Sequence, residues 1–102
     1  MEINFYAKKI YKIVCQIPRG KVTTYGALSK KINLNCPRLV GKILHNNPKP
    51  GAIPCHRVVN WKGRVSKNFA FGGAKAQIQR LRKECVVIKN KIVDMKKYFW
   101  FV

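Results

Sequence analysis

The segment of this sequence best suited to covalent chemistry is Cys55-His56-Arg57. Neighbouring cations lower a thiol pKa and raise the fraction of reactive thiolate, so Cys55 is a candidate nucleophile. The alternative is that Cys55, like most lone cysteines, is a small buried hydrophobe. Adjacent side chains of an extended segment point to opposite faces, so His56 would reach Cys55 only through a bridging water or a bend at Pro54.

A histidine that acts as a base also needs an acceptor that orients it. Carboxylates are scarce: they are Glu2, Glu84 and Asp94, and Glu2 lies at the terminus. Glu84 lies at the flank of an amphipathic helical stripe, from which a side chain can turn inward, so we expect it to hold His56. A structural salt bridge to an arginine or lysine is its alternative role. Adjacent cysteine and histidine residues seldom ligate one ion, so we predict no metal and no other cofactor.

The elements that hold these residues are predicted to be mainly helices, because apolar residues recur at helical spacing. The first helix is expected over residues 3–17, where a proline and a glycine follow and end it. A second helix, capped by a threonine, is expected within residues 23–32. After a tight connection, Pro37 suits the first turn of a third helix over residues 37–45. These two short helices resemble a helix-turn-helix.

Less regular structure is predicted in the second half of the chain. Residues 52–59 should be extended or irregular, because Pro54 biases the residue before it away from helix. A last helix is expected at residues 74–84, and residues 86–93 can form a hairpin that turns at an asparagine. The aromatic run at residues 98–101 is more typical of a packing anchor than of a base-stacking platform. The expected fold is mainly α: a small helical bundle with a winged-helix-like helix-turn-helix and a short C-terminal hairpin.

Charge is the abnormal property of the composition. Lysine and arginine total 22 against 3 acidic residues, which gives a formal net charge of +19. Such a chain will seek a polyanion. Nucleic acid is the partner we favour, an anionic membrane surface is the second, and a solvated lysine coat without a partner is the third. The 102 residues predict one domain, which we expect to be a monomer.

Two further observations bear on the compartment. No apolar run of about 18 residues exists, and the N-terminal residues lack a signal-peptide pattern, so no membrane span or secretion is predicted. The four cysteines form no C-x-x-C pair. Free thiols in a reducing, cytoplasmic environment are the expectation.

The predicted third helix has a basic face opposite its apolar stripe. At 100° per residue, Arg38, Gly41, Lys42 and His45 fall together on that face. A glycine there costs about 1 kcal/mol of helix stability against alanine. Close approach to a nucleic-acid backbone would explain Gly41, and a helix packing site is the alternative. His45 is expected to be a polar surface residue.

Four segments occur in a characteristic order and spacing. They are Gly20-Lys21-Val22-Thr23-Thr24-Tyr25-Gly26, Arg38-Leu39-Val40-Gly41, Asn47-Pro48 and Ile53-Pro54-Cys55-His56-Arg57-Val58-Val59. They resemble the DNA-binding, active-site domain of the 6-O-alkylguanine-DNA alkyltransferases, also called methylated-DNA–protein-cysteine methyltransferases. The resemblance covers about residues 5–100. It implies one domain over residues 1–102, without the separate N-terminal domain that many members carry.

The resemblance implies a suicidal, single-turnover repair enzyme. Cys55 would accept a methyl or larger alkyl group from the 6-oxygen of a guanine flipped out of DNA. His56 would act through water as its base, and Glu84 would hold His56. Tyr25 would push the 3′ phosphate and hydrogen-bond the flipped guanine. Asn47 would be the hinge between the recognition helix and the active-site segment.

The resemblance also implies how double-stranded DNA is bound. The recognition helix would dock in the minor groove, with Arg38 filling the space that the flipped base leaves. The DNA-binding residues would be Arg38, Gly41, Lys42, Tyr25, Thr24 and Arg57. The pocket for the alkylated base would be formed by Val58, Phe69, Ala70 and Phe71.

Three departures from the family pattern lie outside the nucleophile. Ala70, flanked by two phenylalanines, stands where the family has a tyrosine, Gln77 stands where a lysine is common, and Cys85 replaces a glycine. These changes bear on the substrate loop and so on the range of alkyl groups.

Two other functions compete with a repair transferase. The first is a non-catalytic damage-binding module, like the alkyltransferase-like proteins that flag lesions for other repair. Those resemble this chain in size but lack the acceptor cysteine, so Cys55 argues against that reading. The second is a basic helix-turn-helix architectural or regulatory protein with inert thiols.

Overall fold

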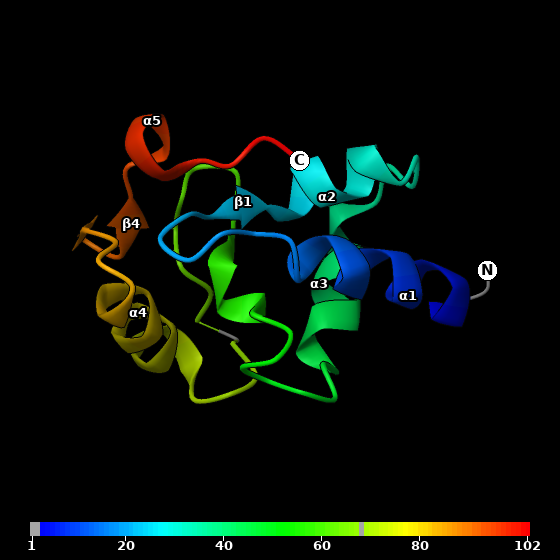
Figure 1. The fold of residues 1–102 in the computed structure, drawn as a ribbon, viewed down its shortest axis with the longest axis horizontal. Helices are drawn as coiled ribbons and strands as arrows, with labels where there is room; N and C mark the ends of the chain where they lie inside the picture. The colour runs from blue at the N-terminus through cyan, green and yellow to red at the C-terminus, as the bar shows by residue number, and fades with distance from the viewer. Residues whose placement is uncertain (1–2, 68) are drawn as a thin grey trace.

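Three helices pack together in the N-terminal half of the chain: α1 (Ile3–Val14), α2 (Tyr25–Lys31) and α3 (Pro37–His45). They belong to a computed structural model that describes residues 3–67 and 69–102 (Figure 1). The apolar faces of these helices meet in one core, where Ile10, Leu28 and Val40 are fully buried. The predicted mainly helical bundle is confirmed.

The first helix is shorter than predicted. It ends at Val14, and residues 15–17 continue as a turn in which the Ile17 amide donates to the Val14 carbonyl. Pro18 disfavours helical backbone at the residue before it, which explains the early end. The turn still places Ile17 in the core, because its side chain is only 1% exposed.

The helix-turn-helix is confirmed at α2 and α3. The Thr24 hydroxyl accepts a hydrogen bond from the Ala27 amide at 3.0 Å, which is the predicted threonine cap of α2. Pro37 occupies the first turn of α3, as expected. In the connection, Asn33 and Asn35 have positive φ angles of 57° and 51°, a conformation that asparagine tolerates better than most residues.

A small parallel sheet joins α2 to the cysteine segment, and the sequence did not predict it. Strand β1 (Thr23–Thr24) pairs with β2 (Val58–Val59), with Thr23 opposite Val58. Residues 52–59, expected to be extended or irregular, include a turn of 3-10 helix, η1 (Cys55–Arg57), directly before the extended residues of β2. The Pro54 carbonyl accepts a hydrogen bond from the Arg57 amide, which closes this turn.

The C-terminal half contains α4 (Gly73–Lys83), β3 (Ile88–Lys89), β4 (Ile92–Val93) and the short helix α5 (Met95–Tyr98). The predicted hairpin is confirmed. Its two turn residues, Asn90 and Lys91, both have positive φ angles, 53° and 63°, as a type I′ turn requires. Helix α5 was not predicted; Asp94 caps it by accepting a hydrogen bond from the Lys96 amide.

A second core lies under these C-terminal elements, at the other end of the molecule from α1 (Figure 1). Its fully buried members include Val22, Leu81 and Val93. The aromatic run at residues 98–101 packs as predicted at Tyr98, which is 7% exposed, and at Trp100, which reaches the first core. The prediction is wrong for Phe101, which is 83% exposed.

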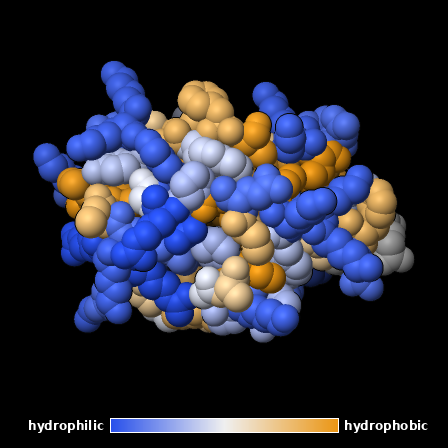
Figure 2. Space-filling model, in the orientation of Figure 1, coloured by the Kyte–Doolittle hydropathy of each residue, from blue (hydrophilic) through white to orange (hydrophobic). Residues whose placement is uncertain are grey.

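Hydrophilic side chains cover much of the face drawn in Figure 2, with apolar atoms showing between them. Lysines project from the exposed sides of α1 and α2, where Lys8, Lys12 and Lys30 lie. Within residues 3–67 and 69–102, no helix is both long enough and apolar enough to cross a bilayer.

Candidate functional site

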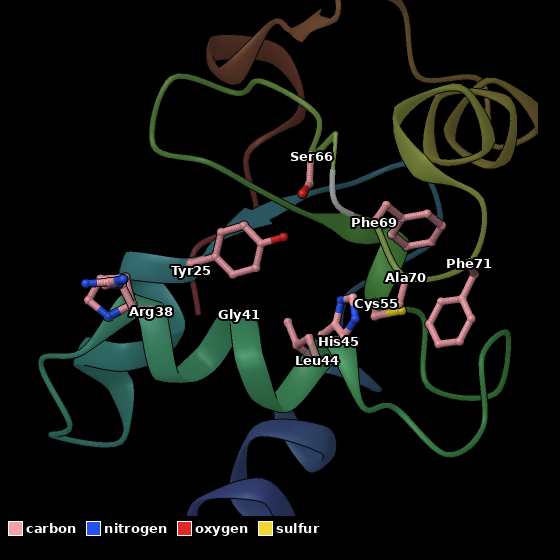
Figure 3. Close-up of a pocket in the computed structure, with 11 residues that line it drawn as sticks. Tyr25, Arg38, Gly41, Leu44, His45, Cys55, Ser66, Phe69, Ala70 and Phe71 are labelled. Atoms are coloured by element: carbon pink, nitrogen blue, oxygen red, sulfur yellow. The ribbon is translucent and has the colours of Figure 1, made fainter.

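A cavity of about 390 Å³ opens between α3 and the loop that precedes α4 (Figure 3). Segments far apart in the sequence form it, because the β1–β2 pairing brings the start of α2 beside the cysteine turn. Its lining residues are Tyr25, Pro37, Arg38, Gly41, Leu44, His45, Cys55, Ser66, Phe69, Ala70 and Phe71.

Cys55 lines the cavity from the η1 turn and is 5% exposed. Burial raises the pKa of its thiol, and this effect outweighs the hydrogen bond with the Asn47 side chain and the positive charge of Arg80, which both lower it. The expectation that neighbouring cations leave Cys55 with a lowered pKa is therefore wrong. The group in the cavity is a thiol that needs a base.

His56, Arg57 and Glu84 form one hydrogen-bonded group beside Cys55. His56 Nε2 lies 2.9 Å from Glu84 Oε2, and Arg57 Nη2 donates to the same oxygen at 2.7 Å. Arg57 Nε donates to Glu84 Oε1 at 2.9 Å, which makes the ion pair bidentate. Glu84 thus has both roles considered for it: it contacts His56 and it pairs with an arginine.

The electrostatics of this group fix the ionisation of its members. Burial raises the pKa of Glu84, but hydrogen bonds from Arg57 and His56 outweigh it and lower the pKa to about 2. Burial lowers the pKa of His56, against the opposing effect of Glu84. At neutral pH the pair is therefore a carboxylate and a neutral imidazole.

The neutral tautomer of His56 follows from the same contacts. An ionised carboxylate only accepts hydrogen bonds, so Nε2 must carry the proton that it donates to Glu84. Nδ1 then carries the free lone pair. This atom is buried and has no hydrogen-bond partner among the described residues, so it is available to take a proton.

Gln77 fastens the cysteine turn to α4, a contact the sequence analysis missed. Its Nε2 donates to the carbonyls of His56 and Val58 at 3.1 and 2.9 Å, and its Oε1 accepts from the Ser66 amide at 2.8 Å. Gln77 is fully buried. The available signal was spacing: Gln77 precedes Glu84 by two helical turns, so both fall on one face of α4.

Arg80 was also missed. Its guanidinium carbon lies 5.5 Å from the ring centroid of Phe69 and 5.9 Å from that of Phe71, within the range of cation–π contact. The two rings meet edge to face, 5.5 Å apart. Arg80 therefore supports the aromatic wall of the cavity, and its charge acts on Cys55.

Tyr25 enters the cavity from the first turn of α2, and its hydroxyl points across the cavity (Figure 3). Burial raises the pKa of its phenol, so the group stays protonated at neutral pH, and it makes a hydrogen bond with the Ser66 side chain. Asn47 joins the end of α3 to the cysteine segment. It donates to the Ile53 carbonyl at 2.8 Å and accepts from the Lys49 amide at 2.9 Å.

The proposed pocket residues and DNA-binding residues do not all face the cavity or solvent. Phe69, Ala70 and Phe71 line the cavity, whereas Val58 is fully buried in the first core. On α3, Arg38 and Lys42 are exposed, and Gly41 faces the Tyr25 ring.

Two other expected DNA contacts are engaged inside the protein. The Thr24 hydroxyl caps α2, and the Arg57 guanidinium binds Glu84 and the Ile17 carbonyl. Within the described part of the chain, no group of three or more His, Cys, Asp or Glu residues is arranged to hold a metal ion.

Comparison with known proteins identifies the class. The family model for the DNA-binding domain of 6-O-methylguanine DNA methyltransferase matches residues 5–86, so the chain belongs to this family. It is 31% identical to Alkyltransferase-like protein 1 of Schizosaccharomyces pombe over 98% of both chains. It is 39% identical to the methylated-DNA–protein-cysteine methyltransferase of Methanocaldococcus jannaschii, with 90% of this chain covering 55% of that protein.

Solved structures give the same result for the fold. The S. pombe Atl1 protein, crystallised with damaged DNA containing O6-carboxymethylguanine, has a TM-score of 0.87 and 32% identity over 98% of both chains. The O6-methylguanine-DNA methyltransferase of Pyrococcus kodakaraensis has a TM-score of 0.66 and 36% identity, with 79% of this chain covering 46% of that one. The family resemblance predicted from the sequence is confirmed.

Proposed function

We propose that this protein repairs alkylated guanine in double-stranded DNA by transferring the alkyl group to Cys55, once per chain. The observation that carries the proposal is the Cys55 thiol in a base-sized cavity, next to a neutral His56 whose Nδ1 has no hydrogen-bond partner in the described part of the chain. The family includes proteins named as methyltransferases of this kind, among them the M. jannaschii relative.

The transfer is a displacement at the alkyl carbon. The Cys55 proton passes through a water to His56 Nδ1, and the resulting thiolate attacks the carbon attached to the guanine 6-oxygen. A carbon–sulfur bond forms as the carbon–oxygen bond breaks, and the electron pair stays on the base. The guanine anion then takes a proton from solvent. The thioether is inert, so each chain acts once.

The buried network favours the proton transfer. A thiol with a raised pKa is a poor nucleophile until a base removes its proton, and His56 is kept neutral for that task. The ionised Glu84 stabilises the imidazolium that forms and fixes the ring orientation. The Tyr25 hydroxyl, which stays protonated, donates a hydrogen bond to the leaving base.

Binding requires that the target base leave the duplex, because its 6-oxygen is hidden by pairing and stacking. The exposed Arg38 and Lys42 on α3 supply phosphate contacts and a side chain to fill the gap. Related proteins support this mode: the chain is 33% identical to the DNA base-flipping protein of Escherichia coli, over 93% of this chain and 74% of that one.

A non-catalytic lesion-binding protein is the alternative, and one observation favours it. The similarity to Alkyltransferase-like protein 1 of S. pombe extends over 98% of both chains, whereas the M. jannaschii methyltransferase is covered over 55% of its length. Against this alternative stands Cys55 itself, since the alkyltransferase-like proteins lack the acceptor cysteine.

The test is the fate of the base. Duplex DNA with one 6-O-methylguanine is mixed in excess over the protein, digested to deoxynucleosides and analysed by chromatography. A transferase converts the modified deoxynucleoside to deoxyguanosine until one equivalent per chain is used. Cys15→Ala, which removes an exposed free thiol, is the matched control and should transfer normally. Unchanged modified nucleoside with tight lesion binding would establish the alternative.

A further inference from the structure

A second cavity, of about 370 Å³, lies next to the first and shares Tyr25 and Ser66 with it. Its remaining lining residues are Asn60, Arg64, Val65, Lys67, Ala74 and Lys91. Three of these are cations that come from two separate parts of the chain. The mechanism of alkyl transfer uses none of the three.

The three cations of the second cavity are exposed, and their charges are not neutralised by the protein. Among the described residues, Arg64, Lys67 and Lys91 have no carboxylate within ion-pair distance. Glu84 is engaged with Arg57 and His56, and Asp94 caps α5. The cavity therefore holds uncompensated positive charge on a concave surface, which concentrates anions.

Backbone contacts fix the positions of two of these cations. Arg64 pairs with Ile92 in an isolated antiparallel bridge, and the Val65 amide donates to the Lys91 carbonyl at 3.0 Å. The Asn60 side chain accepts from the Arg64 amide at 2.8 Å. These bonds hold the backbone of Arg64 next to the hairpin turn that carries Lys91, and both residues line the same cavity.

We propose that this cavity binds a backbone phosphate of the DNA strand that carries the damaged guanine. The proposal rests on the proposed function: Tyr25 and Ser66 line both cavities, so a base held in the first cavity is adjacent to the second. We therefore expect the sugar-phosphate chain that carries this base to pass close to the second cavity. A guanidinium and two ammonium groups suit a phosphodiester, which arginine can bind through two hydrogen bonds.

The test combines removal of charges from the second cavity with neutralisation of single phosphates in the DNA. The variant Arg64→Ala/Lys91→Asn removes two charges, and asparagine suits the left-handed backbone at residue 91. Binding is measured by fluorescence anisotropy in a Cys55→Ala background, which prevents covalent product. The lesion strand carries a single neutral methylphosphonate at each linkage within two nucleotides of 6-O-methylguanine, one linkage per duplex.

We expect one linkage whose neutralisation costs the parent protein about tenfold in affinity at ~0.1 M salt. Neutralising that linkage should cost the double variant less than twofold in affinity, because the cations that bind this phosphate have already been removed. Lys8→Ala/Lys12→Ala removes two exposed charges from α1 and is the matched control, which should keep the full loss.

Three outcomes would overturn the phosphate site. In the first, neutralising each linkage costs the double variant as much affinity as it costs the parent. In the second, the control variant shows the same reduced loss as the double variant. The third is a small-anion site, shown if inorganic phosphate shifts the Val65 and Lys91 amide resonances while no linkage is coupled. Because transfer is measured separately with Cys55 intact, failure of the phosphate site and failure of transfer are distinguishable.

Discussion

The buried acceptor network and the exposed face of α3 hold their charges in opposite ways. In the acceptor network, His56, Arg57 and Glu84 are buried or half-buried, and their side chains are joined through Glu84 by hydrogen bonds no longer than 2.9 Å. On α3, Arg38 and Lys42 are exposed, with no ion-pair partner among the residues that the structure describes. Burial requires pairing, whereas solvent tolerates free charge.

The difference shows where the chain uses its few acids. With 22 basic and 3 acidic residues, most cations must remain unpaired. Glu84 is placed against His56 and Arg57 beside Cys55, and the surface is left to a polyanionic partner. Changes in the acceptor network should therefore alter chemistry and stability, whereas changes to the exposed cations of α3 should alter DNA binding and leave stability unchanged.

Cys55→Ala tests this separation with the largest effect. Methyl transfer should be abolished, because Cys55 is the one cysteine among the described residues that line the cavity. Lesion binding should change by less than about 0.5 kcal/mol, since the cationic surface is untouched. Transfer is followed as restored guanine and binding by anisotropy. Persistent transfer would place the acceptor at another cysteine.

Glu84→Gln should break the acceptor network. Leaving Arg57 without its anionic partner costs about 3 kcal/mol of unfolding free energy, measured by urea denaturation. Transfer should also slow, because an amide stabilises the His56 imidazolium poorly. Asp94→Asn is the matched control: it makes the same change at an exposed helix cap, where asparagine also caps well. Equal stability losses in both variants would contradict the special role of Glu84.

The acceptor network also predicts the pH dependence of stability. The folded pKa of Glu84 is about 2, below its ordinary value of 4.5, so its contribution is full above pH 4.5 and is lost as the pH falls toward 2. The folded pKa of His56 is also lowered, so stability begins to fall below pH 6.5. Urea denaturation across this range should show both losses. A stability that rises on acidification from pH 7 would contradict the assignment of a neutral His56.

Arg38→Ala tests the exposed face of α3. If Arg38 fills the space left by the flipped base, duplex repair should slow by about tenfold, equivalent to ~1.4 kcal/mol, while repair in single strands stays near the parent rate. Only a duplex has a stack to fill. Stability should be unchanged, because Arg38 is exposed. Equal loss in duplex and single strand would remove the gap-filling role.

Gly41→Ala gives the smallest expected effect and separates the two explanations of this glycine. An added Cβ would lie 3.9 Å from the Tyr25 ring, an ordinary contact, so packing permits the change. The helix should gain about 1 kcal/mol. If DNA approaches the α3 backbone here, duplex binding should weaken although stability rises. Unchanged binding would leave Gly41 without a role at the interface.

Local patterns predicted several elements correctly, although α5, which also has a local cap at Asp94, was missed. The threonine cap of α2, Pro37 at the start of α3 and the left-handed turn at Asn90 each depend on a few neighbouring residues. The parallel β1–β2 pair could not be predicted in this way. Two-residue strands carry little pattern, and Thr23 pairs with Val58 across a long stretch of chain.

Sequence motifs indicated several of the residues that the structure gathers at the cavity. Residues that reach the site only through tertiary packing were missed. Gln77 and Arg80 carry no motif, and their contacts arise because α4 packs against the cysteine turn. The sign of the Cys55 pKa shift was predicted wrongly for a similar reason. Arg57 lies two residues after Cys55 in the sequence, but in the fold its guanidinium binds Glu84. Burial is therefore the largest influence on the pKa of the Cys55 thiol.

The most direct test of the central claim is the intact mass of the protein after mixing with duplex DNA that contains 6-O-methylguanine. The account predicts a gain of one methylene per chain, mapped to the peptide that contains Cys55, with no further gain when DNA is in excess. An unchanged mass despite tight lesion binding would contradict it and make the protein a damage sensor whose cysteine does not react.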